Sequence, residues 1–188
     1  MELAVATSRT PEQYVCTLRE GLELTSRMRL LVEAIRELTD PQQNRIGTQE
    51  SLPLDLLVRE TAAGLRPIAE ENNLRLVLQY HELLPVKGDR KRLTELTFRL
   101  LESGLSLAQS GTEVRITMSS EENCAVLVCS WTHALVREHS PFSRAELGLL
   151  LARAGWEQAG ASWSEESVGS VQSFAIRIPT VSSPPSLQ

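Results

Sequence analysis

Cys129, His133 and His139 carry side chains that commonly bind zinc, and they lie close together in the sequence. A closed zinc site needs four ligands, and the spacing of these three matches no common zinc finger, so structural roles are the better interpretation. A serine nucleophile at Ser130 or Ser140 beside a histidine is weaker still, because no Gly-x-Ser-x-Gly turn surrounds either serine. These residues therefore predict neither a metal centre nor a hydrolase.

The composition favours one compact domain with an appended element. The chain has 188 residues, of which 41% are hydrophobic, and a formal net charge of −5. An acidic chain without a basic stripe is a poor binder of nucleic acid, so Trp131, Trp156 and Trp163 are interpreted as core or groove residues.

Three cysteines are an odd number without metal-like spacing, which argues against a disulfide framework and favours a reducing cytoplasm. No apolar run approaches the roughly 20 residues that span a bilayer. The first residues lack the charge and length of a signal peptide. The sequence thus predicts a cytoplasmic chain with no membrane segment.

Residues 88–108 predict an amphipathic helix with a distinctive order of residues. Asp89 is a natural N-cap, and leucines then recur at helical spacing on one face. The order Gly-Asp, then Arg-Leu, then Leu-Leu-Glu-Ser-Gly-Leu resembles the N-box helix of the histidine kinase ATP-binding domain. That superfamily also includes the gyrase-type and Hsp90-type ATPases.

The resemblance extends over residues 10–179. Residues 54–78 look like the first helix and strand of that domain, residues 146–155 like the helix after its last glycine box, and residues 159–179 like its closing strand pair. It implies an α+β fold, a two-layer α/β sandwich of the histidine kinase ATP-binding type, preceded by a long N-terminal helix.

The resemblance also implies where a nucleotide would bind. The N-box asparagine that helps to hold magnesium falls at Ser103, and the polar residue one turn earlier falls at Arg99. Glu102 and Gly148 would complete such a pocket. The Asp-x-Gly-x-Gly box should lie at residues 130–135, which read SWTHAL and lack it.

The absence of the N-box asparagine and of the Asp-x-Gly-x-Gly box matters for nucleotide binding. Magnesium triphosphate needs oxygen ligands in octahedral geometry and flexible backbone close to the phosphates. Serine reaches less far than asparagine, Arg99 would repel the metal, and Glu138 comes too late to replace the missing aspartate. No glycine occurs in residues 112–147, and the connection at residues 132–142 is too short for a mobile lid. We therefore expect no cofactor, with ATP and magnesium only if divergent residues bind them.

A long helix is predicted from Thr10, as N-cap before Pro11, to about Thr39. Its apolar residues follow the 4-3-4-3 spacing of a coiled coil or bundle and form the predicted interface stripe: Leu24, Met28, Leu31, Ile35 and Leu38. Within the resemblance it looks like the second helix of the dimerisation and phosphoacceptor hairpin. The first helix, with its phosphorylated histidine, is not in this sequence, whose only histidines are His81, His133 and His139.

The chain is divided into four parts. They are the long helix (residues 1–40), a linker (41–52), the ATP-binding-like domain (53–180) and a disordered tail (181–188). Within the domain we predict a helix at residues 55–72 and strands at residues 74–80, 85–88, 114–118, 125–131, 161–164 and 171–178. These strands should form a mixed sheet with three helices on one face.

The start of the last helix is well specified. Ser143 and Glu146 predict a capping box, with Phe142 and Leu147 as a hydrophobic staple. Gly155 is predicted to end this helix. Gly148 is interpreted as a small residue where the helix meets the sheet.

Three functions stay open. The first is a histidine-kinase-like signalling module, degenerate in ATP binding, that meets a signalling protein or a response-regulator-like partner and associates through its long helix, as a homodimer or otherwise. The second is the active ATP-binding portion of a sensor histidine kinase that phosphorylates a histidine located elsewhere. The third is a structural dimerisation protein in which only the helix matters.

Overall fold

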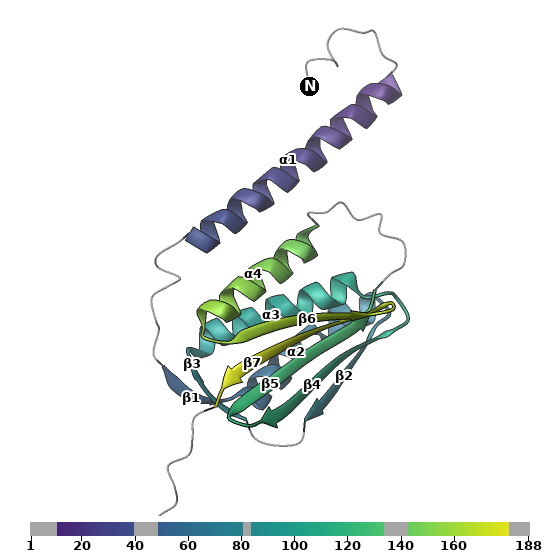
Figure 1. Ribbon diagram of the computed structural model, residues 1–188. Coiled ribbons are helices and arrows are strands. Elements are labelled where there is room, and N and C mark those ends of the chain that lie inside the picture. Colours follow the sequence, from purple (N-terminus) through teal and green to yellow (C-terminus); the bar gives the residue numbers. More distant parts are fainter. Residues whose placement is uncertain (1–10, 40–48, 81–83, 134–142, 181–188) are drawn as a thin grey trace, which may run out of the picture.

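The computed structural model describes residues 11–39, 49–80, 84–133 and 143–180, which form a long helix followed by a two-layer domain (Figure 1). The elements are α1 (Pro11–Thr39), β1 (Glu50–Pro53), α2 (Leu54–Glu71), β2 (Arg75–Tyr80), β3 (Pro85–Gly88), α3 (Arg90–Leu107), β4 (Glu113–Glu121), β5 (Cys124–Thr132), α4 (Arg144–Gln158), β6 (Ser162–Val168) and β7 (Val171–Pro179). The predicted α+β sandwich with a preceding helix is confirmed.

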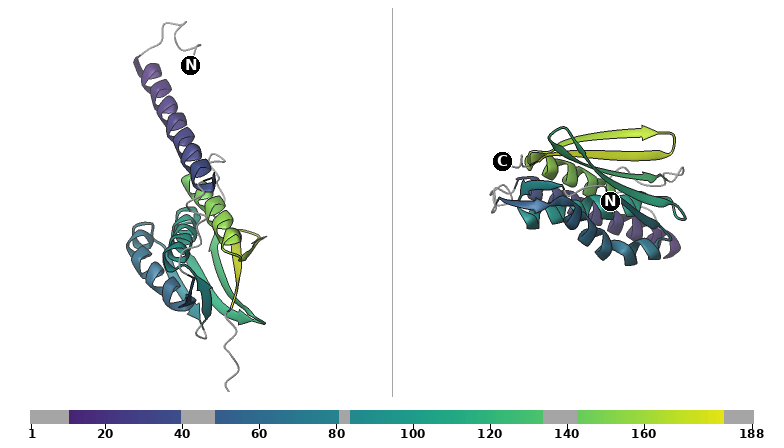
Figure 2. Two further views of the ribbon diagram at one scale, coloured as in Figure 1. Left: turned by 90° about the vertical axis from the view of Figure 1, so that its left-hand side faces the viewer. Right: turned by 90° about the horizontal axis from the view of Figure 1, so that it is seen from below.

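The main sheet has five strands in the order β2-β4-β5-β7-β6. Strands β2 and β4 pair in parallel, and the other neighbours pair antiparallel. A parallel pair needs a crossover connection, and the chain between β2 and β4 supplies one that contains α3. Helices α2, α3 and α4 all lie on one face of the sheet, as predicted (Figure 2).

The core lies between this face and the helices. Strand β5 is the middle strand, and its alternate residues Leu127, Cys129 and Trp131 are buried. Helix α3 supplies Leu100 and Leu105 to the same core. Because leucines and β-branched residues fill most of the volume, the low aromatic content does not prevent a continuous core.

Strand β1 was missed in the sequence, whereas its partner β3 was predicted at residues 85–88. Strand β1 pairs antiparallel with β3, from Glu50 opposite Gly88 to Pro53 opposite Pro85. The domain therefore begins before residue 53, inside the segment predicted as linker. A four-residue strand shows little alternation of its own, and here its position depends on pairing with β3 and on burial of Leu52.

The boundaries of α4 correct one prediction. The capping box between Ser143 and Glu146 is present, whereas Phe142 of the predicted staple lies outside the described residues. Gly155 does not end the helix, which continues to Gln158. A Cβ at Gly155 would lie 2.2 Å from Leu96 Cδ2, so this glycine permits close packing of α4 on α3.

Helix α1 points away from the sheet, and it contacts the domain through α4 (Figures 1 and 2). Of the predicted stripe, Leu24, Met28 and Ile35 are 59–61% exposed. Leu31 is half-buried, and the side chain of Leu38 lies outside the described part. The described helices include none that is long and apolar enough to cross a membrane.

Alkylation of the three cysteines should follow their burial. Burial raises the pKa of the Cys129 thiol from 9.0 to about 12, because the thiolate loses its hydration there. Since the thiolate is the reactive form, iodoacetamide at pH 8 should modify Cys129 about a thousandfold more slowly than the exposed Cys16. Mass spectrometry of peptides over time measures both rates. Unfolding in urea should equalise them, and equal rates in the folded protein would contradict this placement of Cys129.

Candidate functional site

The residues expected to line a nucleotide pocket lie on α3 and α4, which pack directly against each other. Asp89 caps the start of α3, where its side chain accepts a hydrogen bond of 2.8 Å from the Arg92 backbone N–H. The starts of the two helices are thus fixed by N-terminal caps, at Asp89 and at Ser143. The site can be built from the side chains where they meet.

Ser103 and Gly148 are brought together at this helix contact. Ser103 is only 3% exposed, and a Cβ built on Gly148 would lie 2.3 Å from the Ser103 Oγ. Gly148 therefore meets helix α3 rather than the sheet, which corrects the sequence interpretation. The serine hydroxyl and the glycine backbone fill the space between the two helices at this level.

Trp131 fills the neighbouring space on the sheet side of α3. A Cβ on Gly104 would lie 2.9 Å from the Trp131 ring, so the indole rests directly on the helix backbone. The same indole stacks on Phe174 with ring centroids 5.1 Å apart. Trp131 belongs to the segment in which the Asp-x-Gly-x-Gly box was sought. Instead of a carboxylate and flexible glycines, β5 carries a buried aromatic residue just before its end.

The other two predicted pocket residues, Arg99 and Glu102, lie on α3 with Ser103. Arg99 pairs with Glu95 on its own helix, with 2.8 Å between Nη2 and Oε1. Glu102 is half-buried on the same helix. An arginine that already neutralises a carboxylate on its own helix is less available for a phosphate group.

The end of β5 is tied to the last turn of α3 by His133. Its Nδ1 lies 3.0 Å from the backbone oxygen of Leu107, a hydrogen bond in which the ring nitrogen must donate. Its backbone N–H donates to the Ser170 oxygen at 2.7 Å. His133, which the sequence analysis considered as a possible zinc ligand, therefore has a structural role. No group of three or more metal-binding side chains exists among the described residues, and His139 lies outside them.

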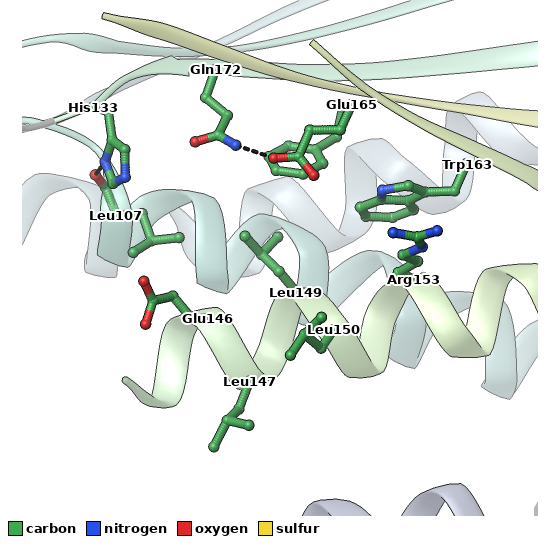
Figure 3. A pocket seen from close by; sticks show the side chains of 11 residues that line it. Leu107, His133, Glu146, Leu147, Leu149, Leu150, Arg153, Trp163, Glu165 and Gln172 are labelled. Atoms are coloured by element: carbon green, nitrogen blue, oxygen red, sulfur yellow. Dashed lines mark hydrogen bonds between the residues drawn. The ribbon is translucent and has the colours of Figure 1, made fainter. Parts of the chain in front are cut away.

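A groove of about 290 Å³ lies beside this point, between α4 and the β6–β7 hairpin (Figure 3). Its apolar walls are Leu107, Leu147, Leu149, Leu150, Trp163 and Phe174, and its polar residues are His133, Glu146, Arg153, Glu165 and Gln172. Sequence reasoning missed most of them, because residues of a helix and a distant hairpin meet only in the fold. The sequence singled out His133, Glu146, Leu147 and Trp163 for other reasons and did not predict that they share a groove.

No family model matches the sequence, and no curated protein matches it. Solved structures match its fold. The Acinetobacter baumannii histidine kinase AdeS is 16% identical with a TM-score of 0.65, over 95% of this chain and 89% of that one. The catalytic domain of histidine kinase ThkA is 20% identical with a TM-score of 0.62, over 71% and 97%.

A complex of ThkA with the response regulator protein TrrA gives a TM-score of 0.68 at 16% identity, over 96% of this chain and 55% of that one. At these identities the likeness shows the fold. The described residues thus have the fold of the C-terminal part of histidine kinases, as the order of residues in α3 led us to expect.

The contact between Ser103 and Gly148 can be measured by a double-mutant cycle. Gly148→Ala alone should lower the free energy of unfolding by about 1–3 kcal/mol, because the new methyl group overlaps the Ser103 hydroxyl. Adding Ser103→Ala, which removes that hydroxyl, should recover at least about 0.5–1 kcal/mol. Urea unfolding followed by circular dichroism gives all four values.

Gly64→Ala is the matched control for this cycle. Gly64 lies inside α2 with no atom within 4 Å of its built Cβ, so alanine there should stabilise the helix by up to about 1 kcal/mol. Strictly additive effects of the two substitutions at 103 and 148 would show that the helices do not meet there.

Proposed function

We propose that this chain is a histidine-kinase-like signalling module that has lost ATP binding and acts through contacts with other proteins. The observation that carries the proposal is the direct contact between Ser103 and Gly148. In this interpretation, the position expected to hold magnesium contributes to helix packing. A module of this kind keeps the scaffold and uses its surfaces.

Coordination chemistry supports this proposal. Magnesium needs about six oxygen ligands near 2.1 Å and keeps several waters, so it requires open space around any ligating side chain. The Ser103 hydroxyl is buried between two helices, and Trp131 covers the adjacent stretch of α3 backbone. Binding of a magnesium triphosphate at Ser103 would require α4 to separate from α3. That separation would expose Leu96 and other buried leucines, which is costly.

Helix α1 supports the part of the proposal that concerns partners. Besides the predicted stripe, Leu18 and Val32 are both 64% exposed, and they widen the apolar face in the way that a helical bundle requires. We propose that this face packs against a second copy of the chain. The ThkA–TrrA complex motivates a response-regulator-like protein as the second type of partner. The three free cysteines suit the reducing cytoplasm in which such signalling takes place.

The alternative function is an active ATP-binding portion of a sensor histidine kinase. It is favoured by the fold, which this chain shares with a histidine kinase catalytic domain. Residues Arg99, Glu102, Ser103 and Gly148 would then have to rearrange around the nucleotide. The two functions differ in one measurable property, the affinity for magnesium nucleotide.

Calorimetry with a non-hydrolysable ATP analogue and magnesium separates them. We expect no heat of binding up to millimolar ligand, because the space at Ser103 is occupied by Gly148. Micromolar affinity that is lost in Ser103→Ala would overturn the proposal and support the kinase. The control is Ser106→Ala, which removes a hydroxyl from the exposed side of the same helix.

Association through α1 is tested by analytical ultracentrifugation. The whole chain should sediment as a dimer, and a chain that starts after Asp40 should be a monomer. Met28→Asp should weaken the dimer about a hundredfold or more, because it buries a charge in the interface. Ser26→Asp adds the same charge to another exposed position of α1 outside the stripe and should have little effect. Equal association of the whole and shortened chains would exclude this role of α1.

A further inference from the structure

The groove between α4 and the β6–β7 hairpin is separate from the contact between Ser103 and Gly148. Neither of these residues lines it. Its volume of about 290 Å³ is at the lower end of the range for small-molecule sites, which indicates a ligand smaller than a nucleotide. The groove and the contact of Gly148 with Ser103 are therefore distinct places on α4.

One part of the groove is apolar and well supported. Phe174 is held between Trp131 and Trp163, with ring centroids at 5.1 and 5.3 Å. On the opposite wall, formed by α4, Leu150 is 59% exposed. A ring or branched alkyl group placed here would cover Leu150 and contact Phe174. The apolar walls therefore select a ligand with a compact apolar body.

The charges are separated along the groove. Glu146 and Arg153 are seven residues apart on α4, which places them on one face of the helix about 10 Å apart along its axis. Figure 3 shows Glu146 on the side of the groove with His133, and Arg153 on the other side, beneath Trp163. Arg153 is paired with Glu157 at 3.0 Å, so its charge is partly neutralised.

Two carboxylates line the groove, Glu146 from α4 and Glu165 from the hairpin, and both have spare acceptor capacity. Glu146 Oε2 accepts from the backbone and the hydroxyl of Ser143 in the capping box. Glu165 Oε1 accepts from the side-chain amide of Gln172. Among the described residues no hydrogen bond is made to the second oxygen of either carboxylate. Carboxylates with an available oxygen match a group that only donates hydrogen bonds and carries positive charge.

We infer that the groove binds a small organic cation, a primary amine attached to an aromatic or branched apolar body. The ammonium group lies at Glu165 on the hairpin wall, Glu146 adds negative charge from α4, and the apolar body lies against Leu149, Leu150 and Phe174. An anion of the same shape is disfavoured, because it meets two carboxylates and one arginine that is already paired.

Tryptamine and indole-3-propionate are suitable probes, because they share one ring and differ in the sign of their charge. Binding to the whole chain is followed by ¹H–¹⁵N NMR, in which the indole N–H of Trp163 is identified by its loss in Trp163→Phe. Tryptamine should shift this signal and backbone signals of α4 and β6, with at least about tenfold higher affinity than indole-3-propionate.

Two neighbouring glutamates give a matched pair of variants. Glu165 lines the groove, and Glu166 follows it on the same exposed strand, with its side chain on the opposite face of the sheet. Glu165→Gln should weaken tryptamine binding about five- to tenfold, whereas Glu166→Gln should change it less than twofold. Leu150→Ala, at an exposed position, should weaken both probes to the same extent.

Three results would overturn the inference. They are tighter or equal binding of indole-3-propionate, an equal effect of the two glutamine variants, and the absence of groove shifts at millimolar tryptamine. Thermal unfolding of each variant checks that these exposed substitutions leave the fold intact. An affinity for the ATP analogue would bear on the proposed function alone, since that ligand is expected at Ser103.

Discussion

The close approach of α3 and α4 is the constraint on which the domain depends. Two glycines on α4 make it possible, Gly148 at Ser103 and Gly155 at Leu96, and they lie seven residues apart on one face of the helix. Ala152 lies between them and is fully buried. On its other side α3 uses Gly104 to accept the ring of Trp131. Small residues thus bring three elements into contact, and leucines fill the remaining volume.

This packing decides what the site can do. Packed helices have few ways to open gradually, because interiors have the density of organic crystals and side chains cannot yield by small amounts. The space around Ser103 is therefore closed unless α4 moves as a unit. The groove on the far side of α4 is open, since there the helix faces a hairpin instead of another helix. The proposed ligand groove thus lies on α4, whereas the proposed partner face lies on α1.

The sequence predicted most elements of the fold because their signals are local. The N-cap at Asp89, the leucines of α3 and the capping box at Ser143 each depend on residues a few positions apart. The order of residues in α3 also led to the correct fold. The β1–β3 pair and the interior place of Gly155 were missed, because a short strand and a helical glycine are explained only by what they contact.

The candidate site was less predictable for the same reason. Ser103 and Gly148 were named from the family pattern, but their mutual contact could be seen only in three dimensions. The groove joins α4 to residues of β6 and β7 that no periodicity links to it. The sequence could therefore name candidate residues, whereas the packing of the helices decides which of them meet.

The burial of Trp131 and Trp156 also affects the stability of the domain. Both indole N–H groups are buried without an acceptor among the described residues. A buried donor without a partner costs about 1–3 kcal/mol, while each ring contributes a large apolar area. The two effects oppose each other. Phenylalanine at either position would lose part of the buried apolar area and would also remove the N–H group that lacks an acceptor. At both positions the large ring fills the interior while its N–H group stays without an acceptor among the described residues.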